Sequence, residues 1–142
     1  MVQETILAEI QNASALVEWF DFWPSFHDAE VLSILLKREG ESCVKVHAFA
    51  GTSDLDASGH YVCIKHVTVN FLLEGVSTVQ LDGFNNQNVI SGLGLEKRDD
   101  GYELKLYGCY GVEGWLVSNR VRLVLEPGIP QGSQYAGGTE LK

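Results

Sequence analysis

The sequence lacks the features of a membrane protein and of a disulfide scaffold. No apolar run approaches the roughly 18 to 20 residues that a membrane-spanning helix needs. The three cysteines, Cys43, Cys63 and Cys109, have no CxxC spacing and lie in apolar runs, where a free thiol behaves as a small hydrophobic side chain. The first residues carry neither the basic head nor the apolar segment of a secretory signal. We therefore expect a cytoplasmic protein with free thiols.

Positive charge is also scarce. Ten Lys and Arg residues stand against 19 Asp and Glu residues, so the net charge is −9. The acidity is concentrated at the front, because no Lys or Arg precedes Lys37. A surface of this sign repels the phosphates of nucleic acids and attracts basic proteins. We therefore expect no nucleic-acid partner and allow a basic protein partner, although many ordinary enzymes are equally acidic for solubility alone.

The common catalytic, nucleotide-binding and metal-binding motifs are missing as well. The glycines never form GxGxxG after a strand, nor GxxxxGK. Ser25 stands between Pro24 and Phe26, where a nucleophile elbow needs glycine. His60 and His66 share strand parity, but along a regular strand they would lie roughly 20 Å apart. We therefore expect no catalytic residue, no cofactor and no metal site.

What the sequence does contain fits one globular domain. At 142 residues it is long enough to bury an apolar core without disulfides. Its last stretch, PGIPQGSQYAGGTELK, is rich in glycine, proline and polar residues and has no apolar periodicity. We predict a globular domain over residues 1–127 and a flexible tail over residues 128–142.

Apolar periodicity predicts one helix followed by strands. Between about residues 4 and 18, apolar side chains recur at helical spacing, which predicts a helix that Asn12–Ser14 can interrupt. From Ala29 onward the period falls towards two, and AEVLSILLKREG with SCVKVHAFAG is typical of a hairpin. TSDLDASGH is typical of a loop, and the later apolar segments, ending with WLVSNRVRLVLEPG, are typical of strands with short connections. The predicted fold is α+β and mainly β: an N-terminal helix and a curled antiparallel sheet of about six or seven strands.

The stretch WPSFHDAEV, residues 23–31, allows two interpretations. In the preferred, structural one, Pro24 sets a turn, while Ser25 and Asp28 have the S-x-x-D spacing that caps backbone N–H groups. In the alternative, His27, Asp28 and Glu30 form an enzyme or small-ligand pocket beside Trp23. The predicted structural motif comprises Trp23, Pro24, Ser25, Phe26, His27 and Asp28.

A cluster of amide side chains follows in DGFNNQNVISGL, residues 82–93. Amides both donate and accept hydrogen bonds, so they suit tight turns and also the recognition of a partner's backbone. Both interpretations stay open. The cluster consists of Asn85, Asn86, Gln87 and Asn88.

Three stretches carry a resemblance to a known family. They are WPSFHDAEV at 23–31, HVTVNFLLEGV at 66–76 and GFNNQNVISGL at 83–93. In this combination, after an N-terminal helix, they resemble the immunity protein 50 family of bacterial polymorphic-toxin systems. The resemblance extends over most of the chain, from about residue 15 to residue 126. It implies a small cytoplasmic protein, without catalytic residues, that binds and neutralises a cognate toxin.

An acidic inhibitor of this kind can complement its target in charge. Many toxins in such systems attack nucleic acids and need basic surfaces. We therefore predict an immunity protein that binds a basic toxin through the acidic residues at the front of the chain and through the amide cluster. The predicted contact residues are Glu4, Glu9, Glu18, Asp21, Asn85, Asn86, Gln87 and Asn88.

Overall fold

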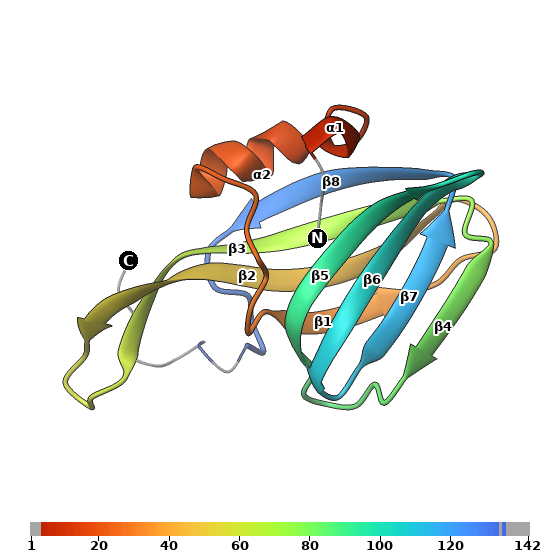
Figure 1. Ribbon diagram of the computed structural model, residues 1–142. Coiled ribbons are helices and arrows are strands. Elements are labelled where there is room, and N and C mark those ends of the chain that lie inside the picture. The colour runs from red at the N-terminus through yellow and green to blue at the C-terminus, as the bar shows by residue number, and fades with distance from the viewer. Residues whose placement is uncertain (1–3, 134, 136–142) are drawn as a thin grey trace.

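The fold is one antiparallel sheet with two short helices packed against it (Figure 1). The computed structural model describes residues 4–133 and 135. The elements in chain order are α1 (Glu4–Leu7), α2 (Ala13–Phe20), β1 (Glu30–Leu35), β2 (Glu41–Leu55), β3 (Tyr61–Glu74), β4 (Thr78–Asp82), β5 (Val89–Arg98), β6 (Gly101–Tyr110), β7 (Glu113–Ser118) and β8 (Arg120–Pro127). The strand order across the sheet is β4-β7-β6-β5-β1-β2-β3-β8. Within the described residues, no helix has the length and apolar character needed to cross a membrane.

The predicted class is confirmed, but the strand count is not. The chain is mainly β and its strand pairs are antiparallel, yet the sheet has eight strands rather than about six or seven. The segment WLVSNRVRLVLEPG contributes to both β7 and β8, because the chain reverses at Asn119, whose N–H donates to the carbonyl of Glu74 (2.9 Å). Neither glycine nor proline marks this turn. TSDLDASGH is only partly loop, since β2 continues to Leu55.

The predicted N-terminal helix is broken into two. α1 ends at Leu7 and α2 begins at Ala13, and Asn12 between them has a left-handed backbone (φ 73°). The break contacts the outer edge of β8. There the N–H of Leu123 donates to the carbonyl of Gln11 (3.0 Å), and the Asn12 amide donates to the carbonyl of Leu123 (3.0 Å). The helical segment therefore covers an edge that would otherwise expose unpaired backbone groups.

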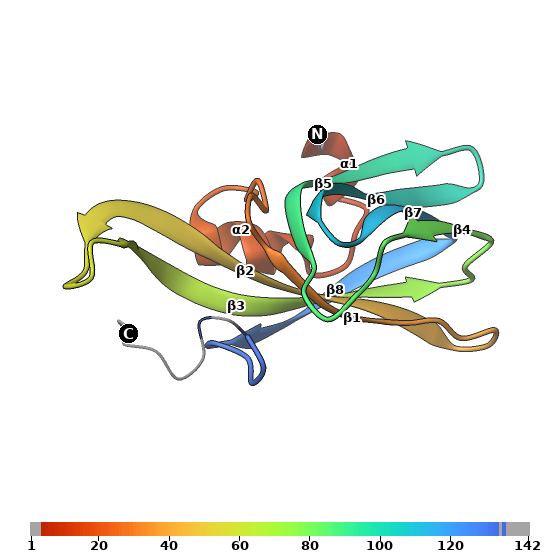
Figure 2. The same ribbon diagram turned by 90° about the horizontal axis from the view of Figure 1, so that it is seen from below.

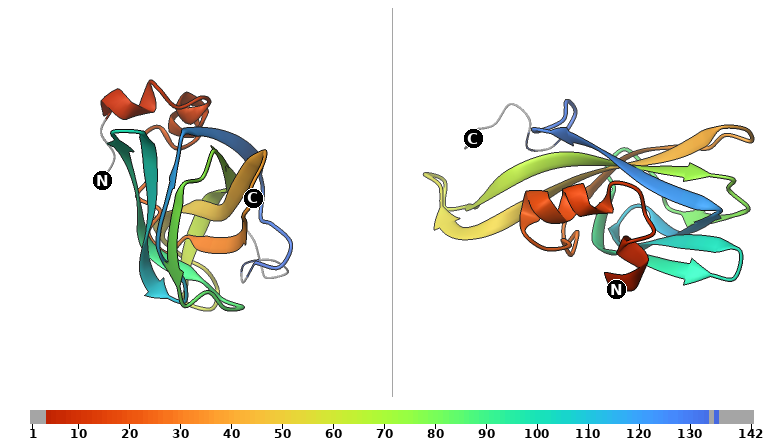
Figure 3. Two further views of the ribbon diagram at one scale, coloured as in Figure 1. Left: turned by 90° about the vertical axis from the view of Figure 1, so that its right-hand side faces the viewer. Right: turned by 90° about the horizontal axis from the view of Figure 1, so that it is seen from above.

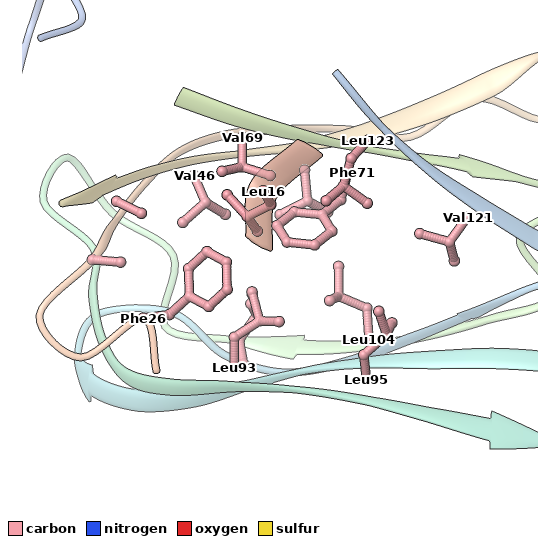
Figure 4. Close-up of a cluster of buried hydrophobic side chains, with 14 of the residues drawn as sticks. Leu16, Phe26, Val46, Val69, Phe71, Leu93, Leu95, Leu104, Val121 and Leu123 are labelled. Carbon is pink, nitrogen blue, oxygen red and sulfur yellow. The ribbon is translucent and has the colours of Figure 1, made fainter. Parts of the chain in front are cut away.

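The sheet curls so that β5 and β6 face β2, β3 and β8 across one core. In Figure 4, Leu93 and Leu104 point across this core toward Val69 and Phe71. α2 lies over β8 and β3, as Figures 1 and 3 show, and its Leu16 is fully buried in the same cluster. Each half of the sheet thus has an inner face in the core and an outer face that the core does not use.

The long β2–β3 hairpin contains a β-bulge that positions the residues after it. Beyond Ala50 and Ile64 the two strands pair, within the described residues, only with each other, and the hairpin projects to one side in Figure 2. The bulge lies at Lys65 (φ 58°), whose carbonyl accepts the indole N–H of Trp19 in α2 (2.8 Å). Because a bulge changes the direction of the side chains beside it, this one sets where His66 points.

Candidate functional site

The stretch WPSFHDAEV connects the two halves of the sheet. The backbone N–H of Asp28 donates to the Ile90 carbonyl (2.9 Å), and the N–H of Ile90 donates to the Ala29 carbonyl (3.0 Å). In the strand pairing itself, β1 and β5 meet only at Glu30 and Val89. The segment therefore strengthens a short junction between β1 and β5, which is a structural role.

Its aromatic side chains attach the segment to the core. The ring of Phe26 is buried, with its centroid 5.9 Å from that of Phe71 and 6.0 Å from that of Trp23. Pro24 is also buried. The Ser25 hydroxyl accepts a hydrogen bond from the N–H two residues later (3.2 Å), so the serine provides the local turn contact that its position suggests.

Asp28 does not have the capping role that the S-x-x-D spacing suggests. Within the part of the chain that the structure describes, its carboxylate accepts no bond from a backbone N–H and is exposed. Its Oδ2 lies 3.6 Å from Nε2 of His27, which is exposed as well. The backbone of Asp28 is left-handed (φ 65°), a conformation that aspartate tolerates better than most residues. Aspartate therefore suits this position because it tolerates the left-handed backbone conformation, and not because its side chain caps a backbone N–H group.

This difference changes what a substitution should do. Asp28→Ala should destabilise the chain by about 1 kcal/mol, because alanine is strained at positive φ, whereas Asp28→Gly should be neutral or slightly stabilising. Thermal unfolding of the two variants measures the difference. Equal losses in both would instead point to the carboxylate.

The alternative pocket of His27, Asp28 and Glu30 is not assembled. Glu30 is buried and points to a different partner: its Oε1 lies 2.6 Å from Nδ1 of His47, which is fully buried. On the other side of that ring, Nε2 lies 2.9 Å from Nδ1 of His66. Glu30, His47 and His66 come from three adjacent strands and form a polar cluster on the outer face of β1, β2 and β3.

The hydrogen-bond partners fix where the protons of this cluster lie. The carbonyl of Cys63 can only accept, so Nε2 of His66, 3.1 Å away, carries a hydrogen. Nδ1 of a neutral His66 is then an acceptor, and Nε2 of His47 donates to it. The remaining ring nitrogen, Nδ1 of His47, lies 2.6 Å from Oε1 of Glu30, within hydrogen-bond distance. Each of these buried groups therefore has a hydrogen-bond partner, which lowers the cost of its burial.

The segment after β8 covers the cluster. The Ser133 hydroxyl donates to Oε1 of Glu30 (2.5 Å) and accepts from the N–H of Tyr135 (3.0 Å). The Tyr135 ring packs edge-on against His47 with centroids 5.7 Å apart, and burial raises the pKa of its phenol to about 12. Ser133 is buried, contrary to the expectation that residues after 127 have nothing to bury. Residues 134 and 136–142 lie outside the described residues, so the flexibility of the whole tail stays a prediction.

This cluster contains catalytic residue types without a catalytic arrangement. In a Ser-His-acid triad the serine and the acid contact opposite ring nitrogens, whereas Ser133 (3.3 Å) and Glu30 (2.6 Å) both approach Nδ1 of His47. The nearby Cys63 thiol has a pKa raised mainly by burial, which keeps it protonated and weakly nucleophilic. Among the described residues, no group of three His, Cys, Asp or Glu side chains could hold a metal ion.

The amide cluster divides into two structural and two exposed residues. Asn88 is buried, and its Oδ1 accepts from the N–H groups of Asn85 (3.0 Å) and Val112 (3.1 Å). The Oδ1 of Asn85 accepts from the N–H of Gln87 (2.8 Å). Asn85 and Asn88 therefore hold the turn, while the side chains of Asn86 and Gln87 are exposed beside a groove of about 510 Å³.

The predicted acidic contact residues are scattered and partly neutralised. Glu9 accepts hydrogen bonds from Lys97 (2.8 Å) and from the Tyr102 hydroxyl (2.6 Å), which lower the pKa of its carboxyl group. Asp21 is exposed and pairs with Lys65 (3.3 Å). The side chain of Glu18 is exposed, and that of Glu4 lies outside the described part of the chain. The structure does not bring these acids together into one site.

The chain matches no family model, no curated protein and no solved structure. The resemblance to the immunity protein 50 family therefore stays a prediction.

Proposed function

We propose that this chain is an immunity protein, which binds a cognate bacterial toxin in the cytoplasm and blocks it through complementary shape and charge. The supporting observation is the unbalanced surface. Among the described residues five bases form ion pairs with acids one to one, which leaves 14 acids against five bases in the whole sequence. Such a surface attracts a basic protein and speeds its association. The paired bases are Lys45, Lys65, Lys97, Arg98 and Arg122.

The buried polar cluster supports binding rather than catalysis. All four ring nitrogens of His47 and His66 lie within hydrogen-bond distance of protein atoms. The cluster is covered by the segment that carries Ser133 and Tyr135. A general base needs a lone pair that can reach the substrate, and these rings are occupied by their neighbours. We therefore assign the cluster to the scaffold.

Co-expression with the product of the adjacent toxin gene tests the proposal. Cells that make the toxin should grow when this chain is also made, and the two purified proteins should associate with a rate that falls as salt concentration rises. The double variant His27→Ala/Asp28→Gly should protect as well as the unaltered chain, because it removes only the alternative pocket. Loss of protection in that double variant, at normal abundance and stability, would favour the alternative. Absence of both protection and binding by the unaltered chain would refute an immunity function.

A further inference from the structure

The outer face of β4, β5, β6 and β7 carries an aromatic side chain that the core does not use. Along these strands Leu104 and Leu116 point inward and are buried. At the alternate positions, Trp115 of β7 pairs with Gln80 of β4 on one side and with Lys105 of β6 on the other. Trp115 is half-buried and does not belong to the core cluster.

Glycines beside this tryptophan let neighbouring side chains pack directly on the backbone. A Cβ on Gly94 would lie 3.3 Å from the ring of Tyr107, so that ring lies against bare backbone of β5. A Cβ on Gly108 would lie 2.8 Å from Cβ of Glu113, so β6 also has no room for a side chain there. A groove of about 510 Å³ lies on this face, and it is lined by Trp115, Tyr107 and their neighbours on β4, β6 and β7.

The aromatic residues of the groove are of the kind that dominate protein interfaces. Tyr107 is 40% exposed, and Nζ of Lys105 lies 5.0 Å from its ring centroid. Tryptophan and tyrosine are enriched among the residues that contribute most to binding, because they bury a large area at a small entropic cost. Trp115 at the centre and Tyr107 beside it therefore form a suitable contact surface.

Two carboxylates line the groove together with Lys105, and within the described residues no cation pairs with either of them. Asp82 of β4 and Glu113 of β7 lie directly opposite each other and are exposed. Like charges at opposite positions destabilise a strand pair. Two other pairs of acids lie opposite each other, and each has its own cation. Arg98 pairs with Glu103 of the Glu96–Glu103 pair, and Arg122 pairs with Glu41 of the Glu41–Glu74 pair.

We propose that the groove centred on Trp115 receives a lysine or arginine side chain from the surface of the basic partner protein. The cation lies between Asp82 and Glu113, and its apolar stem packs against the indole ring. This inference rests on the proposed function and names a contact surface for it, different from the acids at the front of the chain. A second copy of this chain is a poorer occupant, because it would bring the same two carboxylates to the groove.

The test is the dissociation constant for the purified product of the adjacent toxin gene. Trp115→Ala should weaken binding by about 30-fold, the effect of losing a central aromatic contact, and Asp82→Asn/Glu113→Gln by about tenfold. The double amide variant should also bind with less dependence on salt. Unfolding of each variant is measured in parallel, and if Trp115→Ala does not fold, Trp115→Phe and the double amide variant decide.

Two matched controls alter the same residue types elsewhere. Tyr61→Ala removes an aromatic ring that is 68% exposed at the hairpin, and Glu39→Gln/Asp54→Asn removes two exposed acids that do not line the groove. Both should bind within threefold of the unaltered chain. If the unaltered chain and both groove variants bind equally tightly, the groove is not the contact surface, while the proposed function stands. A dimer of this chain that Trp115→Ala dissociates would assign the groove to a second copy, and no binding by the unaltered chain would remove the proposed function with it.

Discussion

Replacing Glu30 by alanine should destabilise the folded chain by about 3 to 5 kcal/mol, the usual cost of removing one partner from a buried ionic pair. Oε1 of Glu30 lies 2.6 Å from Nδ1 of the fully buried His47 and accepts the hydroxyl hydrogen of Ser133. Without this carboxyl group, the imidazole loses its hydrogen-bond partner at Nδ1, and the hydroxyl loses its acceptor. Unfolding in urea should show a lower midpoint at an unchanged slope.

Two further variants separate this contact from general effects of mutation. Glu30→Gln should cost only about 1 kcal/mol, because the amide can donate to Nδ1 of His47 and accept from the Ser133 hydroxyl, so both contacts keep a partner. Glu96→Ala removes an exposed glutamate of another strand and should change stability by less than about 0.5 kcal/mol. Equal midpoints for Glu30→Ala and Glu96→Ala would contradict the contribution assigned to the cluster.

The polar cluster joins β1, β2 and β3 on their outer face, whereas the apolar core contacts the same strands on their inner face. Glu30, His47 and His66 extend across β1, β2 and β3 on the outer face, while the inner-face neighbours of these strands, such as Val46 and Val69, lie in the core. A fully hydrogen-bonded network of this kind has directional requirements that apolar packing lacks. It can therefore specify the register of the three strands, in addition to any net stability that it contributes.

Much of the fold could be predicted from the sequence, because alternation of apolar residues is a local signal. The change of period after Ala29 correctly separates the helical region from the strands. The interruption of the helix near Asn12–Ser14 could also be predicted, because polar residues interrupt the apolar pattern there. The extra strand could not, because the reversal at Asn119 depends on a tertiary contact: its N–H donates to the carbonyl of Glu74, which is distant in sequence.

The site was harder to predict, for the same reason. His47 and His66 meet only because the β2–β3 register and the bulge at Lys65 bring them together, and no spacing in the sequence encodes that register. Ser133 contacts Glu30 from 103 residues away, in a segment whose composition is typical of a tail. His47 follows the alternation of its strand at an outward position, as Lys45 does, so the local pattern did not mark it as buried.

Removing residues 128–142 should leave a chain that still folds cooperatively but is less stable by about 2 to 3 kcal/mol. Within residues 4–133 and 135, the core cluster includes none after Leu125, so the truncated chain keeps the described apolar contacts that drive folding. It loses the hydrogen bond from Ser133 to Glu30 and the cover that Tyr135 provides over His47. A hydrogen bond to a charged group is worth about 1.5 to 3 kcal/mol, and water replaces it only in part at a buried carboxyl group. Ser133→Ala in the full chain should reproduce about half of the loss, because it removes the hydroxyl and keeps the aromatic cover. Urea unfolding of the three proteins measures both differences. Identical midpoints would show that the segment adds no stability and behaves as a flexible tail, whereas loss of a cooperative transition in the truncated chain would show that the sheet cannot form without it.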